Sequence, residues 1–215
     1  MLRRDYLVRM IEEMTDVLGT VFSLKQQKKH TEALWEMDEL YKRQFRLNGQ
    51  LLNSLSVKDI IDMFRLGDKV EADKLQSMAR LMKEEGLVHL EMKQTDEGLM
   101  RLMKALHLFI YSSFHGADKE LWNVDREVGE VLDAIKGYRP PADTEKLLFR
   151  YEEQEGRYDK AEDVLFRLKQ DGEVGNEEAS AFYSRLLQLD DEALERGGLP
   201  REEVLEGLQE VQSKQ

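Results

Sequence analysis

The sequence predicts an all-α protein, and three observations lead to this prediction. Proline occurs only three times among the 215 residues, while good helix formers such as Leu, Met, Glu and Lys dominate. Apolar residues recur at steps of three and four along most of the chain, which is the period of an amphipathic helix. No segment alternates apolar and polar residues over more than a few positions, so we expect about ten or eleven helices and no sheet.

The N-terminal third contains three apolar stripes at helical spacing, separated by polar or glycine-containing breaks. Asn48-Gly49 closes the second stripe, because both residues readily adopt the left-handed conformation that ends helices. Ser56, with Asp59 three residues later, has the pattern of an N-cap followed by an acid in the first turn. The predicted helices span about residues 4–27, 32–47 and 57–66.

The central third predicts a long helical hairpin followed by one more helix. A stripe of Leu75, Met78 and Met82 indicates the first helix, and Thr95-Asp96 caps a strongly apolar second one. Five methionines lie in this hairpin, and their helical spacing favours core packing over an adaptable binding surface. The predicted helices span about residues 71–93, 95–114 and 119–136.

The segment from Gly137 to Pro141 is the clearest linker, because no helix continues unbroken through a Pro-Pro pair. We therefore expect a helical array over residues 1–138 and C-terminal helical hairpins over residues 139–215, joined in one continuous structural unit. The C-terminal part predicts one hairpin over residues 144–170 and a second from about residue 176, which a pair of glycines divides again.

Composition excludes several classes of protein. The chain has no cysteine, so it cannot contain a disulfide framework, a zinc–thiolate site, an iron–sulfur cluster or a cysteine nucleophile. Its formal net charge of −12 would repel nucleic acid and anionic lipid, and no apolar stretch approaches membrane-spanning length. Charged residues also interrupt the N-terminal segment where a signal peptide needs an apolar run. We expect a cytoplasmic protein without a nucleic-acid or membrane partner.

The chain contains no dinucleotide-binding, Walker, nucleophile-elbow or zinc-protease motif. Carboxylate pairs such as Glu84-Glu85 are typical of solvated helix faces. The four histidines are scattered, although Glu85 and His89 lie one helical turn apart, where they could share a metal. A surface or partly buried histidine is the more common arrangement. The sequence thus predicts no catalytic residue, no metal site and no cofactor.

A repeated pattern is visible when the predicted hairpins are compared. One turn in the C-terminal part carries a glycine, an aromatic residue, an alanine and two leucines at fixed spacing: Gly156, Tyr158, Ala161, Leu165 and Leu168. This segment resembles the second half of a tetratricopeptide repeat. Ala33 and Gly98 occupy the small-residue position of Ala161 in two earlier hairpins, at intervals of 65 and 63 residues.

These intervals are about twice the length of one tetratricopeptide repeat, so each period holds one consensus-like hairpin and one helical insert. The inserts cover residues 57–66 and 119–136. We expect an α-α superhelix of tetratricopeptide-like antiparallel hairpins, which the inserts make more compact and bundle-like. The opening segment, Asp5 to Glu13, and the Lys-rich hairpin after it also resemble a Firmicutes family of unknown function with such helices.

The tetratricopeptide resemblance implies that a peptide binds along the first helix of each hairpin. Several of the corresponding side chains are basic, although the chain is acidic. Such a face would attract an acidic peptide or a free carboxylate, with Arg80 and Arg150 offering bidentate hydrogen bonds. Alternatively, these cations pair with Glu84, Glu85 and Glu153 across helix turns. The candidate peptide-binding residues are Phe22, Lys25, Arg80, Lys83, Leu87, Leu90, Lys146 and Arg150.

These observations favour a non-enzymatic helical-repeat module that binds a protein or peptide. Two alternatives stay open. One is a homo-oligomeric structural bundle, such as a homodimer formed through the apolar inserts. The other is a small-molecule sensor or an enzyme whose site lies in the central hairpin, beside Met82, His89 and His107.

Overall fold

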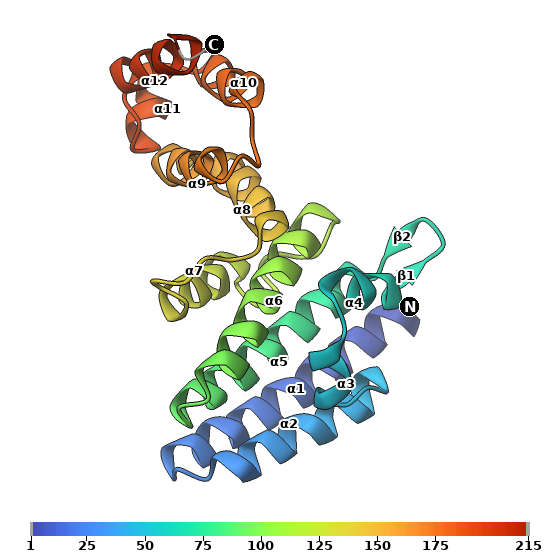
Figure 1. Ribbon diagram of the computed structural model, residues 1–215. Helices are drawn as coiled ribbons and strands as arrows, with labels where there is room; N and C mark the ends of the chain where they lie inside the picture. The colour runs from blue at the N-terminus through green and yellow to red at the C-terminus, as the bar shows by residue number, and fades with distance from the viewer. Residues whose placement is uncertain (1, 214–215) are drawn as a thin grey trace. The chain divides into compact units, whose positions relative to one another are not determined.

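The computed structural model describes residues 2–213, and the chain is helical along most of that length (Figure 1). Twelve α-helices and one two-stranded antiparallel sheet occur in the described part. The prediction of a mostly helical protein with antiparallel helix pairs is confirmed. No described helix is both long and apolar enough to cross a membrane. The chain divides into two compact units, unit 1 (Met1–Arg139) and unit 2 (Pro140–Gln215).

Unit 1 is built on four long helices that form two antiparallel hairpins: α1 (Leu2–Gln26) with α2 (His30–Phe45), and α5 (Ala72–Glu91) with α6 (Thr95–Phe114). Figure 1 shows the first pair in blue and the second in green. The interface between α5 and α6 is the most extensive between any two described helices. Most of the side chains that these two helices bury are apolar, so this hairpin is the core of the unit.

The backbones of α5 and α6 come close together at Gly86 and Gly98. A Cβ atom on Gly86 would lie 2.8 Å from Cγ of Leu102 and 3.0 Å from the carbonyl oxygen of Gly98. A Cβ atom on Gly98 would lie 2.7 Å from Cδ2 of Leu90 and 2.9 Å from the carbonyl oxygen of Gly86. Both positions therefore need glycine for the two helices to cross this closely.

Two short helices, α3 (Gly49–Ser54) and α4 (Val57–Met63), connect the hairpins. The predicted cap of α4 is confirmed by two reciprocal hydrogen bonds. The amide of Asp59 donates to Oγ of Ser56 at 3.1 Å, and the amide of Ser56 donates to Oδ2 of Asp59 at 3.2 Å. These bonds satisfy amide groups that have no partner inside the helix, so α4 begins where the sequence indicates.

The predicted role of Asn48 as the end of a helix is wrong. α2 ends at Phe45, and the next residue, Arg46, takes the left-handed conformation with a φ of 58°. Asn48 lies at the start of α3 instead, where its side-chain oxygen accepts a hydrogen bond from the amide of Leu51 at 2.8 Å. Asparagine is favoured at both ends of helices, so its presence alone does not show which end it marks.

The prediction that the chain contains no sheet is wrong at one place. After α4 the chain forms a short antiparallel hairpin of β1 (Arg65–Leu66) and β2 (Lys69–Val70). Gly67 takes a φ of +60°, so the chain reverses and pairs with itself. Each strand has two residues, and the fold class is unchanged.

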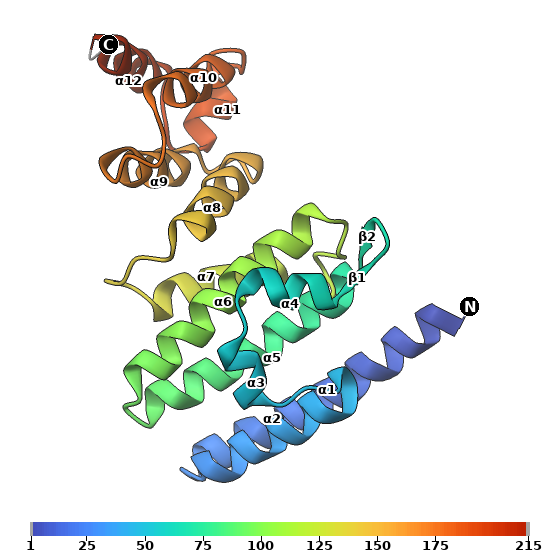
Figure 2. The same ribbon diagram turned by 45° about the vertical axis from the view of Figure 1, so that its right-hand side comes forward.

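The last helix of unit 1, α7 (Val124–Ala134), packs against both α6 and α5. It begins later than predicted, because the chain forms turns up to Asn123, whose side chain caps the helix. Trp122 anchors these turns by donating from Nε1 to Oγ of Ser77 at 3.0 Å. The segment interpreted as an insert therefore adds a third layer beside the α5/α6 hairpin (Figure 2).

Unit 2 consists of one hairpin followed by three more helices: α8 (Ala142–Gln154) and α9 (Tyr158–Gln170), then α10 (Asn176–Leu186), α11 (Asp191–Arg196) and α12 (Arg201–Ser213). α10 packs against α12, and the ring of Phe182 on α10 meets that of Phe149 on α8 edge to face, with centroids 5.3 Å apart. Figure 2 shows α10 and α12 together at the C-terminal end.

Candidate functional site

Three hairpin turns have the same backbone geometry. Each contains a left-handed residue, with φ of 58°, 61° and 73°. The next residue has φ between −90° and −99° and ψ between 60° and 74°. Its amide donates to the carbonyl oxygen five residues earlier, at 2.9 Å in all three turns, which is a common way of closing a helix end. The residue pairs are Lys28-Lys29, Lys93-Gln94 and Gly156-Arg157.

The small residues Ala33, Gly98 and Ala161 lie at the same place after these turns. Each is the fourth residue of the second helix and is buried. Its amide donates a hydrogen bond of 2.9–3.0 Å to the carbonyl oxygen of the residue just before that helix. The hairpins α1/α2, α5/α6 and α8/α9 therefore repeat one local structure. Stacked hairpins of one kind are the units from which helical-repeat binding surfaces are built.

The eight candidate peptide-binding residues are divided between the two units. Lys146 and Arg150 lie on α8 in unit 2, and the other six lie on α1 and α5 in unit 1. Lys146 forms an exposed ion pair with Glu173, with Nζ and Oε2 at 2.7 Å, and the Arg150 side chain is exposed. Leu87 and Leu90 are half-buried, and Leu90 packs against the close crossing of α5 and α6.

The two candidate cations of α5, Arg80 and Lys83, pair with acids of α7. Only 1% of the Lys83 side chain is exposed, and its Nζ lies 2.7 Å from Oε2 of Glu127 and also pairs with Glu130. Arg80 places Nη1 2.5 Å from Oε1 of Glu84 and Nε 3.4 Å from Oε2 of Glu127. Lys83 therefore does not lie on an open face as expected, because α7 packs on that side of α5 and brings two acids.

Lys25, the candidate cation of α1, also pairs with acids of α5. Lys25 places Nζ 3.1 Å from Oε1 of Glu91 and 3.7 Å from Oε2 of Glu84. His30 lies with Nε2 3.0 Å from the other carboxylate oxygen of Glu91. The acids of α5 and α7 thus offset the basic residues that the sequence placed on one face, and little uncompensated positive charge is left for an acidic peptide.

Phe22 is the candidate residue whose apolar side chain is the most exposed, at 62%. Val8, Ile11 and Leu18 share its face of α1 at helical spacing, with Thr15 between them. Val8 is 47% exposed, and Ile11 and Leu18 are half-buried. We call Val8, Ile11, Leu18 and Phe22 the α1 strip, an apolar line that is partly open to solvent.

A buried polar cluster around Glu85 joins α2, α5 and α6. The hydroxyl of Tyr41 donates to Oε2 of Glu85 at 2.9 Å, and Nε of Arg101 donates to Oε1 at 2.8 Å. Burial acts to raise the pKa of Glu85, but the neighbouring His89 and the charge and hydrogen bond of Arg101 outweigh it, so the pKa is lowered. The carboxylate is therefore held ionised inside the helical stack.

The Glu85–His89 pair, which the sequence marked for a possible shared metal, makes contacts within unit 1. Oε1 of Glu85 and Nε2 of His89 are 3.9 Å apart, and Nδ1 of His89 lies 2.5 Å from Oε1 of Gln94. His89 thus connects the buried carboxylate to the turn between α5 and α6. Over residues 5–213, where side chains are described, no group of three or more His, Cys, Asp or Glu residues is arranged to hold a metal ion.

A pocket of about 310 Å³ lies between α9 and α12 in unit 2. The sequence did not indicate it, because its walls come from two amphipathic helices that are distant in the chain. The one local signal is Phe166, an aromatic residue that is 41% exposed although its helix buries its other face. The lining residues are Phe166, Lys169, Gln170, Gly207, Glu210 and Val211.

A protein-family model described as a family of unknown function (DUF6483) matches residues 1–215. No curated protein and no solved structure matches the chain. Its function is therefore inferred from its own residues.

Proposed function

The chain belongs to this family of unknown function (DUF6483), and we propose from its geometry that it is a non-enzymatic, tetratricopeptide-like scaffold that binds a protein partner through the α1 strip. The α1 strip is the observation that carries the proposal. Its four apolar side chains share one face of a long helix, and those at its two ends, Val8 and Phe22, are the most open to solvent.

The stacking in unit 1 supports a tetratricopeptide-like scaffold. α5 packs on both helices of the preceding hairpin, α1 and α2, and α7 packs on both α5 and α6. In helical-repeat proteins each first helix packs in this way on the hairpin before it. α7 takes the place of a first helix in the next layer, and the repeated turn and small residue support the same relationship between the hairpins.

The exposed apolar line supports a binding role. Contiguous apolar surface that a protein leaves open often marks an interaction site, and helices commonly dock through apolar residues at helical spacing. The exposed acids Glu12 and Asp16 follow the solvent side of α1, and Lys25 lies on the side toward α5. A partner helix with one apolar face and polar edges matches this distribution.

A partner helix fits unit 1 better than the acidic peptide expected from the sequence. Lys25, Arg80 and Lys83 already contact carboxylates, and recruiting Arg80 and Lys83 would take cations away from the buried Glu127. Phe22 carries no such cost, because its side chain is open to solvent. Apolar burial on α1 is therefore the larger source of binding free energy.

Quantitative affinity purification from cells of the natural host tests the proposal with wild-type, Phe22→Ser and Trp35→Ser baits. Trp35 is a matched control, because it is 60% exposed on α2 and lies outside the α1 strip. We expect at least one protein to be retained by the wild-type and Trp35→Ser baits and lost from the Phe22→Ser bait. Identical sets of retained proteins on all three baits would contradict the proposal.

A homo-oligomeric bundle is the second candidate, because a second copy of the chain can bury the same strip. Light scattering of the purified wild-type protein and the Phe22→Ser variant separates the two functions. A dimer that the substitution converts to a monomer supports self-association, whereas a wild-type monomer at all concentrations supports a separate partner.

A further inference from the structure

The pocket in unit 2 combines an apolar floor with a polar edge. Phe166 of α9 and Val211 of α12 supply apolar surface, while Glu210 and Lys169 supply charge. A volume of about 310 Å³ accommodates one or two large side chains rather than a whole folded element. The pocket therefore suits a side chain presented by a segment that lies across α9 and α12.

Tyr183 of α10 fixes the distance between α9 and α12 beside the pocket. Its hydroxyl donates to Oε1 of Glu162 on α9 at 2.7 Å. On α12, a Cβ atom at Gly207 would lie 2.5 Å from ring atoms of Tyr183, so α12 runs directly against the ring. The tyrosine is buried and hydrogen-bonded, and its ring fills the space between the two helices.

Charge indicates which kind of segment enters the pocket. Residues 140–215 contain 20 Asp and Glu but 10 Lys and Arg, which is a formal net charge of −10. Residues 1–139 contain 24 Asp and Glu and 22 Lys and Arg. Unit 2 therefore carries most of the formal net charge of −12. A unit with this charge repels nucleic acid and anionic lipid and attracts cationic protein segments.

Carboxylates of both α9 and α12 lie in or near the pocket. Glu210 is part of its lining, and Glu162 lies one helical turn before Phe166 on the same face of α9. Burial raises the pKa of Glu162, and the negative charges of Glu203, Asp163 and Asp159 raise it further. These acids are therefore close enough to repel one another, and a cation placed among them would relieve that repulsion.

We propose that the pocket between α9 and α12 binds a basic amphipathic segment of a partner protein. One apolar side chain of the segment packs on Phe166 and Val211, and its Lys or Arg side chains pair with the carboxylates of α9 and α12. The site shares no residue with the α1 strip, so its test and that of the proposed function give separate answers.

Fluorescence anisotropy with the full-length chain tests the proposal. The probe is a labelled Leu/Lys amphipathic peptide of about four helical turns. One reference peptide has Glu in place of every Lys, and a second has Ser in place of every Leu. We expect the Leu/Lys peptide to bind at least about tenfold more tightly than either reference, because both charge and apolar contact are needed.

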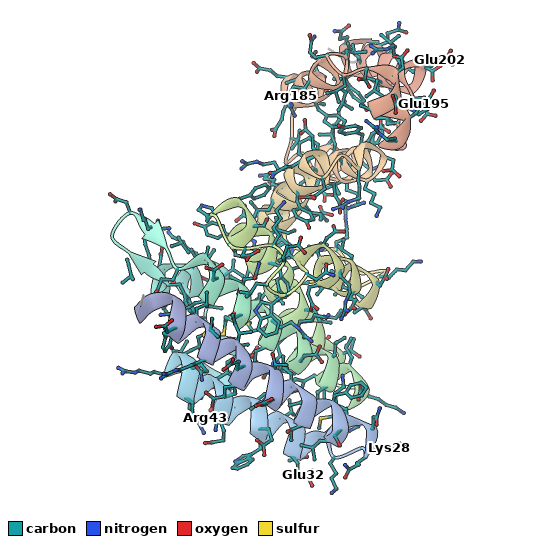
Figure 3. All side chains as sticks on the ribbon, turned by 180° about the vertical axis from the view of Figure 1, so that it is seen from behind. Lys28, Glu32, Arg43, Arg185, Glu195 and Glu202 are labelled. Atoms are coloured by element: carbon teal, nitrogen blue, oxygen red, sulfur yellow. The ribbon has the colours of Figure 1, made fainter. Side chains whose placement is uncertain are left out.

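Variants locate the binding. Phe166→Ala is expected to weaken binding of the Leu/Lys peptide about tenfold, since it removes the floor of the pocket. The pair Glu203→Gln and Glu210→Gln is expected to weaken it about fivefold and to reduce its dependence on salt. The control pair is Glu195→Gln and Glu202→Gln, which Figure 3 labels. These exposed acids of unit 2 neither line the pocket, as Glu210 does, nor are among the charges that raise the pKa of Glu162, as Glu203 is, so their removal should leave binding unchanged.

Hydrogen exchange provides a readout that does not depend on any variant. Bound peptide is expected to slow amide exchange in α9 and α12 of the wild-type chain. Three results would overturn the proposal: equal weakening by the two double variants, unchanged binding by Phe166→Ala, and slowed exchange that is confined to other helices. A Leu/Lys peptide that binds no more tightly than either reference peptide would overturn it as well.

Discussion

The hydroxyl of Tyr41 donates a 2.9 Å hydrogen bond to Glu85, and this bond ties the α1/α2 hairpin to the α5/α6 hairpin. Both side chains are buried, and Arg101 of α6 donates to the other oxygen of the same carboxylate. Three of the four long helices of unit 1 thus meet at one ionised group. The stacking of the hairpins therefore depends on a charge as well as on apolar packing.

Replacement of Glu85 by Gln is expected to destabilise the fold by about 2–4 kcal/mol at pH 7, because Arg101 loses its buried counter-charge. The folded-state pKa of Glu85 lies below its ordinary 4.5, so its contribution is present above pH 4.5 and is lost as the pH falls toward the lowered value. Urea unfolding at pH 7 and at about pH 3.5 measures this dependence. A difference between wild type and variant that does not shrink at low pH would be inconsistent with it.

Lys83→Met is expected to destabilise unit 1 by about 3–5 kcal/mol, because Glu127 remains buried after its closest cation is removed. Adding Glu127→Leu should recover a large part of that loss, since no uncompensated charge is then buried. The exposed Lys58 provides the control, and Lys58→Met should change stability by less than about 0.5 kcal/mol. Urea unfolding of the four proteins makes the comparison, and equal effects of the two single Lys variants would show that the α5–α7 ion cluster is not stabilising.

Gly98→Ala is expected to cost about 1–3 kcal/mol, because the added Cβ would meet the carbonyl oxygen of Gly86 as well as Leu90. Gly129 on α7 is the matched control, since it is exposed and a Cβ there would meet no atom within 4 Å. Gly129→Ala should stabilise the protein by about 0.5–1 kcal/mol, because alanine favours the helix. Thermal unfolding should therefore shift in opposite directions for the two variants, and a neutral Gly98→Ala would argue against the close helix crossing.

Local properties of the sequence predicted most of the helices. α6 covers the range that its apolar stripe predicts, Thr95 to Phe114, but the predicted Thr95-Asp96 cap is wrong, because the N-cap residue is Gln94 and it makes no side-chain cap hydrogen bond. The Ser56 cap of α4 forms as expected. The correspondence of Ala33, Gly98 and Ala161 was also visible, because a small residue at a fixed distance from a turn is a sequence pattern. Local errors arose where one residue type serves two purposes, as Asn48 does at helix starts and ends.

The candidate site depended on contacts that no local pattern contains. Lys83 and Glu127 are 44 residues apart, and the sequence gives no indication that α7 covers α5 there. The sequence therefore predicted a basic face, because it did not show that acids such as Glu127 pair with those basic residues. In the same way, the pocket in unit 2 exists because Phe166 and Gly207 come together across two helices. Periodicity indicates which residues share a face, but it does not indicate which helix packs on that face.

Site-specific photo-crosslinking in cells of the natural host tests whether the α1 strip is a partner-binding face. A photoreactive phenylalanine analogue replaces Phe22 on α1 in one protein and Trp35 on α2 in the other, since both side chains are exposed to a similar degree. We expect a discrete crosslinked product with another protein from position 22 and none from position 35. The same products from both positions, or none from position 22, would contradict a binding role for the strip.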